Sequence, residues 1–401
     1  MKDIFQAQKV TDRIYWVGAI DWSVRDFHGY LTSRGTTYNA FLILADKITL
    51  VDTVKAPFKD ELLARVASVV NPEKIDYIIS NHAEPDHSGC LAAVIEATEP
   101  EKVFTSKNGV KALEAHFRIG DKLTAVEEGE SIDLGGRTVT FAETRMCHWP
   151  DSMVSYVHED KLLFSQDAFG MHLASYERFA DQIEQWILDE EAAKYYANIL
   201  LPLSNFVAKS VEKLASLELP IDYICPDHGP IWREEPLKMV QQYADWANQN
   251  RTNKAVVLYD TMWNSTELMA RAVGEGLASG GTHTVLMSLK GAHRSDVATQ
   301  ILDAGALVVG APTINKEMFP TLADCMTYLK GLKPAGMIGG TFGSYGWGGE
   351  APKDLAAMLD EMNIEQIGEP VRINYVPDSD SLAAARKLGQ DISSELAKRT
   401  A

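Results

Sequence analysis

Short apolar runs, separated by turn-forming residues, divide the first half of the chain into strands with few helices between them. Tyr38–Leu44 is one such run and is typical of a buried strand. From Phe58 to Val69, by contrast, apolar residues recur every three or four positions behind Pro57, which predicts a helix over residues 58–69. The predicted strands of this half cover residues 14–18, 38–44, 48–53, 75–80, 139–144, 161–165 and 221–225.

The second half has the strand and helix alternation that is typical of a parallel sheet. Lys254–Tyr259 is almost entirely apolar, as expected for a strand that is covered on both faces. Because the preceding stretch, residues 246–253, is polar, we predict two domains, residues 1–250 and 254–401. Further strands are predicted at residues 284–287, 306–310 and 336–340, with a helix at 354–362.

Composition supports a folded chain of more than one domain. The sequence has 401 residues, of which 46% are hydrophobic and 23% charged. It contains no apolar run of the roughly 20 residues that span a bilayer and no signal-peptide core, so we expect a cytoplasmic protein without a membrane partner. The formal charge of −18 also disfavours nucleic acid as a partner.

The cysteines exclude several redox sites within this chain. Four are present, widely scattered and without a Cys-x-x-Cys pair, namely Cys90, Cys147, Cys225 and Cys325. This spacing argues against an iron–sulfur cluster, a rubredoxin-like iron site and a disulfide framework.

A dense group of metal-binding residue types follows the predicted strand at 75–80. His82, Glu84, Asp86 and His87 stand within a few positions, where an extended or turning loop can bring alternate side chains together. Imidazole and carboxylate ligands suit iron, manganese or zinc, and a carboxylate-rich set favours iron. The alternative is a polar turn with solvated charges.

Three later strands end in further candidate ligands. His148, Asp167 and His228 each lie just after a predicted strand, near a proline or a glycine. Each alone would more often be a structural residue than a ligand. Together with the group at 82–87 they indicate a metal centre built where strands end.

The order of these residues resembles that of the metallo-β-lactamase superfamily, which implies an N-terminal αββα sandwich. Zinc hydrolases of that superfamily usually have a second histidine where this chain has Glu84. In the flavodiiron proteins, or A-type flavoproteins, the position is glutamate and the site holds two non-haem irons. The resemblance is therefore to the flavodiiron family, and a third carboxylate beside Asp86 and Asp167 would stabilise two irons.

The resemblance implies a role for each candidate ligand. Iron one would be held by His82, Glu84 and His148, and iron two by Asp86, His87 and His228, with Asp167 as the bridge. The family also implies a histidine and a tyrosine beside the open coordination face, matched here by His28 and Tyr196.

The second half resembles flavodoxins, which implies a doubly wound parallel sheet that binds FMN. Hydroxyl and amide side chains follow the strand at 254–259, where helix-start N–H groups can cradle a phosphate. Glycine-containing loops at 310–315 and 341–349 would border a flat ring. The implied phosphate ligands are Thr261, Trp263, Asn264, Ser265 and Thr266, and the implied ring neighbours are Pro312, Thr313, Asn315, Gly343, Tyr345 and Trp347.

These resemblances imply an oxidoreductase that reduces O2 to water, NO to N2O, or both, with electrons relayed through FMN. Because the sequence ends soon after its flavodoxin-like part, we expect a separate electron donor, for which the family suggests rubredoxin. The family also implies a head-to-tail homodimer or a dimer of dimers. The alternatives are a zinc hydrolase of the metallo-β-lactamase type and a non-catalytic FMN electron carrier.

Overall fold

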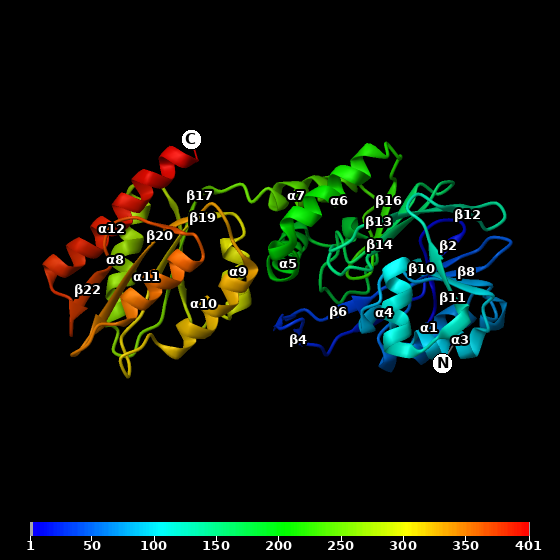
Figure 1. Ribbon diagram of the computed structural model, residues 1–401, viewed down its shortest axis with the longest axis horizontal. Helices are drawn as coiled ribbons and strands as arrows, with labels where there is room; N and C mark the ends of the chain where they lie inside the picture. The colour runs from blue at the N-terminus through cyan, green and yellow to red at the C-terminus, as the bar shows by residue number, and fades with distance from the viewer. Residues whose placement is uncertain (1–2, 401) are drawn as a thin grey trace. The chain divides into compact units, whose positions relative to one another are not determined.

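The chain forms two compact units, seen in the computed structural model, which describes residues 3–400 (Figure 1). The first unit runs to Tyr195 and resumes over Asn205–Ala244; the second comprises Tyr196–Ser204 and the chain from Asp245 onward. The short segment Tyr196–Ser204 therefore groups with the second unit, which composition alone did not indicate.

One layer of the first unit is a seven-stranded sheet in the order β1-β2-β7-β8-β9-β10-β11. Its strands pair antiparallel as far as β8 and parallel from β8 to β11. The strands are β1 (Gln8–Lys9), β2 (Ile14–Trp16), β7 (Phe41–Ile43), β8 (Thr49–Val51), β9 (Tyr77–Ile79), β10 (Lys102–Ser106) and β11 (Leu123–Val126), beside the small pairs β3 (Ala19–Asp21) with β6 (Thr36–Tyr38) and β4 (Asp26–Phe27) with β5 (Tyr30–Leu31).

The second layer is a five-stranded sheet in the order β12-β13-β14-β15-β16, antiparallel except for the parallel pair β15 and β16. Side chains from both sheets share one buried cluster, in which the rings of Phe41 and Phe164 lie 5.0 Å apart. The strands are β12 (Ser131–Asp133), β13 (Thr138–Glu143), β14 (Met153–Val157), β15 (Leu162–Gln166) and β16 (Tyr223–Pro226). The two sheets therefore form a sandwich around an apolar core.

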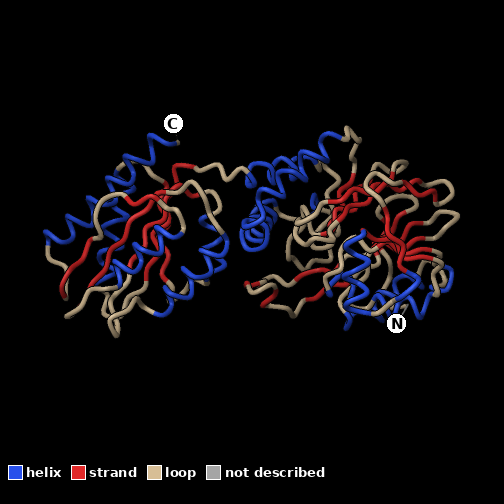
Figure 2. The backbone as a smooth tube through the Cα atoms, viewed as in Figure 1, coloured by secondary structure: helices blue, strands red, loops and turns tan. Residues whose placement is uncertain are grey.

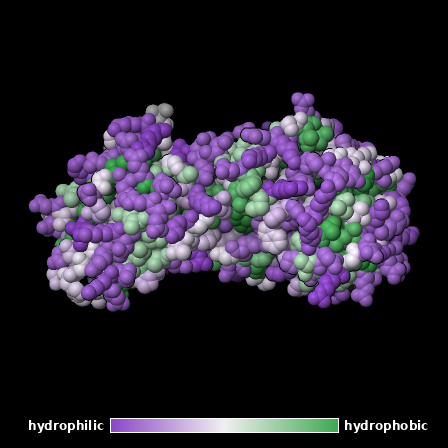
Figure 3. Space-filling view, viewed as in Figure 1, coloured by the Kyte–Doolittle hydropathy of each residue, from purple (hydrophilic) through white to green (hydrophobic). Residues whose placement is uncertain are grey.

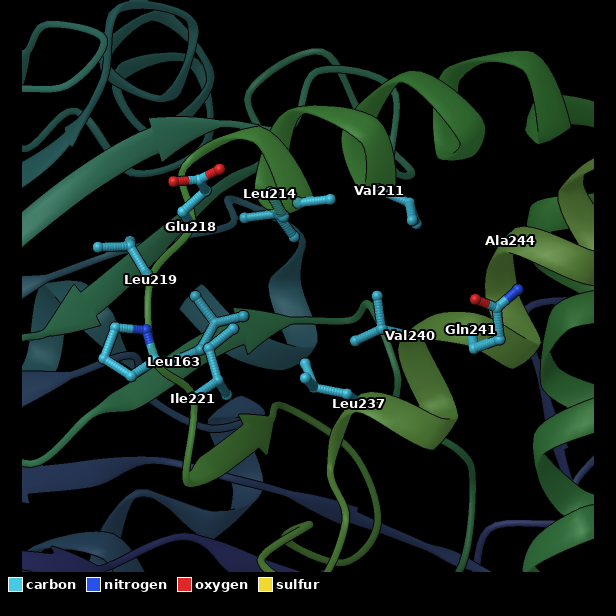
Figure 4. A pocket seen from close by; sticks show the side chains of 12 residues that line it. Leu163, Val211, Leu214, Glu218, Leu219, Ile221, Leu237, Val240, Gln241 and Ala244 are labelled. Atoms are coloured by element: carbon cyan, nitrogen blue, oxygen red, sulfur yellow. The ribbon is translucent and has the colours of Figure 1, made fainter.

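Helices cover both outer faces of this sandwich. Leu62 of α1 and Leu91 of α3 pack with Leu42 and Ile78 of the first sheet. On the other side, α6 and α7 lie over Leu163 of β15 (Figure 4). The α-helices are α1 (Lys59–Ala67), α2 (Pro85–Ser88), α3 (Leu91–Thr98), α4 (Lys107–Phe117), α5 (Gln185–Tyr195), α6 (Ser204–Ser216) and α7 (Leu237–Ala247); shorter 3-10 helices span Ala56–Phe58, Pro72–Lys74, Gly120–Lys122, Ala180–Gln182 and Leu201–Leu203, and a π-helix spans Tyr196–Leu200. The predicted αββα sandwich is confirmed.

The second unit is a parallel sheet with helices on both faces (Figures 1 and 2). The strand order is β18-β17-β19-β20-β21, with β22 also paired to β20, and every pair is parallel. Its elements are β17 (Thr252–Tyr259), α8 (Ser265–Ser279), β18 (His283–Ser288), α9 (Arg294–Ile301), β19 (Ala304–Gly310), α10 (Pro320–Leu332), β20 (Ile338–Tyr345), α11 (Ala351–Glu361), β21 (Glu365–Gln366), β22 (Val371–Asn374) and α12 (Ser379–Arg399).

Residue alternation along β17 explains this doubly wound arrangement. Ala255 and Val257 pack with α8 and α12 in one core, whereas Val256 and Leu258 are equally buried on the opposite face. A strand that is buried on both faces has no side chains that point to solvent, so residues 254–259 are almost continuously apolar. The flavodoxin-like prediction is confirmed.

Two local predictions were wrong. Strand β20 continues to Tyr345, so Thr341, Phe342 and Gly343 lie within a strand and not in a loop. The metal-binding stretch is also partly helical, because Pro85 begins the short helix α2, which carries Asp86 and His87. Proline is favoured at a first helical position, and the sequence pattern around it was too short to show helical periodicity.

The surface is mainly polar on the face shown in Figure 3, with apolar residues in separate patches. One apolar hollow of about 530 Å³ lies between α6, α7 and β15, with Glu218 and Gln241 as its polar lining residues (Figure 4). Its lining includes none of the predicted metal or flavin ligands. Across residues 3–400, the helices are too short or too polar to traverse a bilayer.

Candidate metal centre and ligand pocket

The predicted metal ligands come from segments that follow four strands of the first unit. His82 and Glu84 follow β9, His148 follows β13, Asp167 follows β15 and His228 follows β16. The register of the sheets fixes these strand ends, so side chains separated by as many as 146 residues can meet with little freedom left to the backbone.

His82, Glu84, His148 and Asp167 form one group of facing donor atoms. The Nε2 atoms of His82 and His148 lie 3.2 and 3.1 Å from Glu84 Oε2. They lie 3.3 and 2.9 Å from Asp167 Oδ2. Two imidazoles and two carboxylates therefore present one atom each to a common centre.

Asp86, His87 and His228 form a second group beside the first. The Nε2 atoms of His87 and His228 lie 3.2 and 3.0 Å from Asp86 Oδ2. The same two nitrogens lie 3.1 and 3.4 Å from Asp167 Oδ1. Asp167 thus turns one carboxylate oxygen to each group.

These atoms fit a pair of metal ions. Ligands about 2.1 Å from one ion lie roughly 3.0–3.4 Å apart at tetrahedral or octahedral angles, which matches the spacings in both groups. In the second group, moreover, several buried atoms have no hydrogen-bond partner, namely both oxygens of Asp86, His87 Nε2, His228 Nε2 and Asp167 Oδ1. Leaving so many buried polar atoms unpaired is costly unless a cation binds them.

The carboxylates and imidazoles shift each other's ionisation. Burial raises the pKa of Glu84, but hydrogen bonds with His148, His28 and His82 outweigh burial and bring that pKa far below its usual range. Burial lowers the pKa of His148, yet its hydrogen bonds with Asp167 and Glu84 raise that pKa to about 9. The metal-free site therefore keeps ionised carboxylates beside protonated imidazole.

Oxygen atoms outside the two groups orient the histidine rings. His82 Nδ1 lies 3.2 Å from the carboxylate of Asp151, and His228 Nδ1 donates to the Thr37 carbonyl at 2.6 Å. An acceptor on Nδ1 fixes the tautomer that leaves Nε2 free for a metal. The sequence did not single out Asp151 or Thr37. Asp151 stands three residues after His148, but nothing along the chain shows that it contacts the distant His82, and Thr37 acts through its backbone carbonyl, which no residue type signals.

His28 and a tyrosine lie next to the metal ligands. His28 Nε2 is 2.9 Å from Glu84 Oε1, the oxygen that does not face His82. Tyr195 is fully buried, with its ring 5.2 Å from that of His172 and 6.2 Å from that of His228. Tyr196, the tyrosine singled out from the sequence, belongs to the second unit and packs on Trp246. Tyr195 and Tyr196 are adjacent in the sequence, and their side chains point in different directions. The sequence alone therefore does not show which of the two faces the metal ligands.

The second unit has a pocket of about 460 Å³ at the carboxyl ends of its strands. Most of the predicted flavin residues line it: Thr261, Trp263, Ser265, Pro312, Thr313, Asn315, Tyr345 and Trp347. Met262, Ile314, Ser344, Tyr375 and Val376 also line it and were not predicted. Tyr375 and Val376 follow β22, whose pairing with β20 brings them to this edge.

One end of the pocket suits an anion. Helix α8 begins after Asn264, whose side chain makes no capping hydrogen bond, so the first N–H groups of the helix lack a side-chain cap. The buried hydroxyl of Thr261 also lacks a hydrogen-bond partner. Thr266 differs, since its hydroxyl lies 3.0 Å from that of Ser344.

Gly343 does not line this pocket, and its role is in the packing of strand β20. A Cβ atom at this position would stand 2.1 Å from the carbonyl oxygen of Ala311 and 2.8 Å from Pro352. Glycine is therefore required for the close approach of β20 to the chain after β19.

Comparison with known proteins matches two different family models to the two halves of the chain. A model described as ODP family beta lactamase matches residues 36–229, and a flavodoxin model matches residues 257–389. The rubredoxin-oxygen oxidoreductase of Megalodesulfovibrio gigas is 46% identical over 99% of this chain and 100% of that protein. This chain belongs to the flavodiiron family. The nitric oxide reductase of Moorella thermoacetica is 45% identical, with 98% of this chain and 99% of that protein covered.

Solved structures agree with this membership. The rubredoxin oxygen:oxidoreductase structure from Desulfovibrio gigas has a TM-score of 0.96 and 46% identity, covering 99% of this chain and 100% of that one. The flavodiiron protein of Giardia intestinalis has a TM-score of 0.95 at 31% identity, with 98% of each chain covered. As a flavodiiron protein, this chain takes FMN and two non-haem irons as cofactors, and the paired ligand groups and the anion-binding pocket fit both.

Proposed function

We propose that this flavodiiron protein reduces dioxygen to water, nitric oxide to nitrous oxide, or both. The observation that carries the proposal is Asp167, whose two oxygens face two separate groups of buried nitrogen and oxygen ligands. That arrangement suits two ions held side by side, and a donor set without sulfur that includes Glu84 favours iron over zinc. The names of relatives that are 45–46% identical support reduction of these gases.

We assign the iron ligands by the two groups. Iron one takes His82, Glu84 and His148, and iron two takes Asp86, His87 and His228, with Asp167 as the bridge. When bound, the irons supply electrons and open coordination positions for a diatomic gas. The protein keeps that site apart from bulk water, since His82, His87, Asp167 and His228 are all fully buried or nearly so.

We assign the positioning of protons to His28 and Tyr195. Reduction of either gas consumes protons, and His28 Nε2 lies 2.9 Å from Glu84 Oε1 at a partly exposed position. Burial, followed by the nearby charge of Asp167, raises the pKa of Tyr195, so its hydroxyl keeps its proton and can donate a hydrogen bond. We prefer Tyr195 over Tyr196 for this role because its ring contacts His172 and His228.

In the second unit, we assign the FMN phosphate to the start of α8, with Thr261, Asn264, Ser265 and Thr266 beside it. The isoalloxazine ring is assigned to the side of the pocket lined by Pro312, Thr313, Asn315, Tyr345 and Trp347, with Trp263 at its rim. The apolar and aromatic lining suits a flat ring, and the uncapped helix start suits a dianion.

We propose rubredoxin as the electron donor, because the Megalodesulfovibrio gigas relative is named rubredoxin-oxygen oxidoreductase. We also propose that the protein is cytoplasmic and forms a head-to-tail homodimer. A relative that is 39% identical over 97% of this chain is named coenzyme F420H(2) oxidase, so reduced F420 is the competing donor.

Gas consumption by the full chain, loaded with iron and FMN, tests this function. Oxygen and nitric oxide electrodes would record turnover with reduced rubredoxin or reduced F420, in separate anaerobic and aerobic runs. We expect donor-dependent loss of at least one gas. No turnover of either gas would favour an electron carrier, and zinc content with lactam or thioester hydrolysis would favour a hydrolase.

A further inference from the structure

Behind the second group of metal ligands lies a buried carboxyl group with no hydrogen-bond donor among the described residues. Asp227 follows β16 and is 1% exposed, and neither of its carboxyl oxygens has a hydrogen-bond partner. The nearby Asp52 differs, because its carboxylate accepts hydrogen bonds from the Asn81 backbone N–H at 2.7 Å and from Asn81 Nδ2 at 2.8 Å. A buried, unpaired carboxyl is costly, so its retention requires a partner.

The nearest candidate partner is the ring of His87. His87 Nδ1 lies 3.6 Å from Asp227 Oδ2, slightly beyond hydrogen-bond distance, and also has no partner of its own. The main chain of His87 is fixed, because its carbonyl accepts from the backbone N–H of Thr53 at 3.0 Å and from the Thr53 hydroxyl at 2.5 Å. Only the side-chain torsions are left to decide where the imidazole points.

Other histidines of the centre show what such an acceptor does. His82 has Asp151 at its Nδ1 and His228 has the Thr37 carbonyl, and both present Nε2 to the metal groups. Asp227 occupies the equivalent position for His87. A carboxyl oxygen can accept the Nδ1 hydrogen whether or not the carboxyl itself carries a proton.

We propose that Asp227 is the positioning residue for His87: it accepts the hydrogen of His87 Nδ1 and so holds Nε2 toward the second iron. This inference rests on the proposed two-iron site. A shift of a few tenths of an ångström closes the hydrogen bond once a cation draws Nε2 into place. Without the acceptor, only the cation holds the ring in the ligating orientation, and the second iron is bound more weakly by this nitrogen.

Cobalt binding to the metal-free, FMN-loaded full chain tests this role. We expect wild type to bind two Co²⁺ ions. Asp227→Ala should weaken one of the two by about 10–100-fold and leave the other unchanged. Asp227→Asn, whose amide oxygen can still accept the hydrogen, should restore most of the affinity. FMN content and circular dichroism report on folding, and Asp227→Leu replaces the alanine variant if that variant is insoluble.

A double-mutant cycle with His87 separates positioning from general packing. If Asp227 acts through His87, then Asp227→Ala should cost nothing further in a His87→Ala background. Additive losses in the cycle, or normal binding of both ions by Asp227→Ala and Asp227→Leu, would overturn the inference. Fewer than two Co²⁺ ions in wild type would instead overturn the two-iron proposal itself.

Discussion

The metal centre and the flavin pocket solve opposite binding problems. The centre is closed and charged, and its ligands already face one another in two groups before any ion is bound. The pocket is open and carries few charges, and Trp263 and Trp347 on its lining are 84% and 90% exposed. Metal binding therefore needs side chains whose positions are fixed before the ion binds. A large flat ring, by contrast, can itself cover exposed aromatic side chains when it binds.

Removal of a single side chain should therefore reduce cofactor binding severely at the metal centre and only partly in the pocket. The strongest test is Asp167→Ala. We expect iron to be lost and gas turnover to fall by at least about 100-fold while FMN is retained, because this carboxylate serves both ligand groups. Iron and flavin assays measure this. Asp222→Ala, at an exposed aspartate of the same unit, is the control. Retention of two irons would show that Asp167 is not the bridge.

In the pocket, replacing Ser265 and Thr266 together by alanine should weaken FMN binding by about 10–100-fold and leave iron unchanged. One hydrogen bond to a charged group, here from Ser265, contributes about 1.5–3 kcal/mol, while the Thr266 hydroxyl already faces Ser344 and the helix-start N–H groups remain. Fluorescence titration of the flavin measures the effect. Ser279→Ala, at the far end of α8, is the matched control. Loss of both cofactors would contradict independent units.

The charge of the centre predicts that metal binding depends on pH. Burial lowers the pKa of His148, but Asp167 and Glu84 raise it to about 9, so the metal-free imidazole is protonated below that pH. A metal must displace this proton. The affinity for Co²⁺ should therefore fall by up to about 10-fold per pH unit as the pH drops below 9. Calorimetry in buffers of different ionisation enthalpy would detect the released protons; an affinity that does not vary over this range would contradict the prediction.

The smallest expected effect is at the rim of the pocket. Trp347→Ala should weaken FMN binding only about 2–10-fold, since an exposed aromatic contact contributes roughly 0.5–1.5 kcal/mol. The same flavin titration measures it, with Trp186→Ala of the first unit as the exposed control. A loss as large as that of the Ser265 and Thr266 double variant would show that the pocket depends on this ring far more than its exposure suggests.

The fold was largely predictable because its periodicities are strong. Continuous apolar strands such as residues 254–259 predicted a parallel sheet, and that sheet is present. Boundaries were less predictable. β20 runs on through Gly343, because its pairing with β22 supplies hydrogen bonds that no local pattern shows. The helix at Pro85–Ser88 spans a single turn, which is too short for a helical pattern to appear.

For the site, residue types and their order along the chain determined which side chains could bind metal, because so dense a group of imidazoles and carboxylates, with matching residues after three later strands, is rarely needed for packing. Only the tertiary structure decided how they are shared. It turned one oxygen of Asp167 to each group, placed Asp151 and Asp227 at the backs of His82 and His87, and set Tyr195 against His228. Those contacts depend on the register of strands that are distant in sequence. Register fixes the direction of each side chain and the distances between them, and spacing along the chain fixes neither.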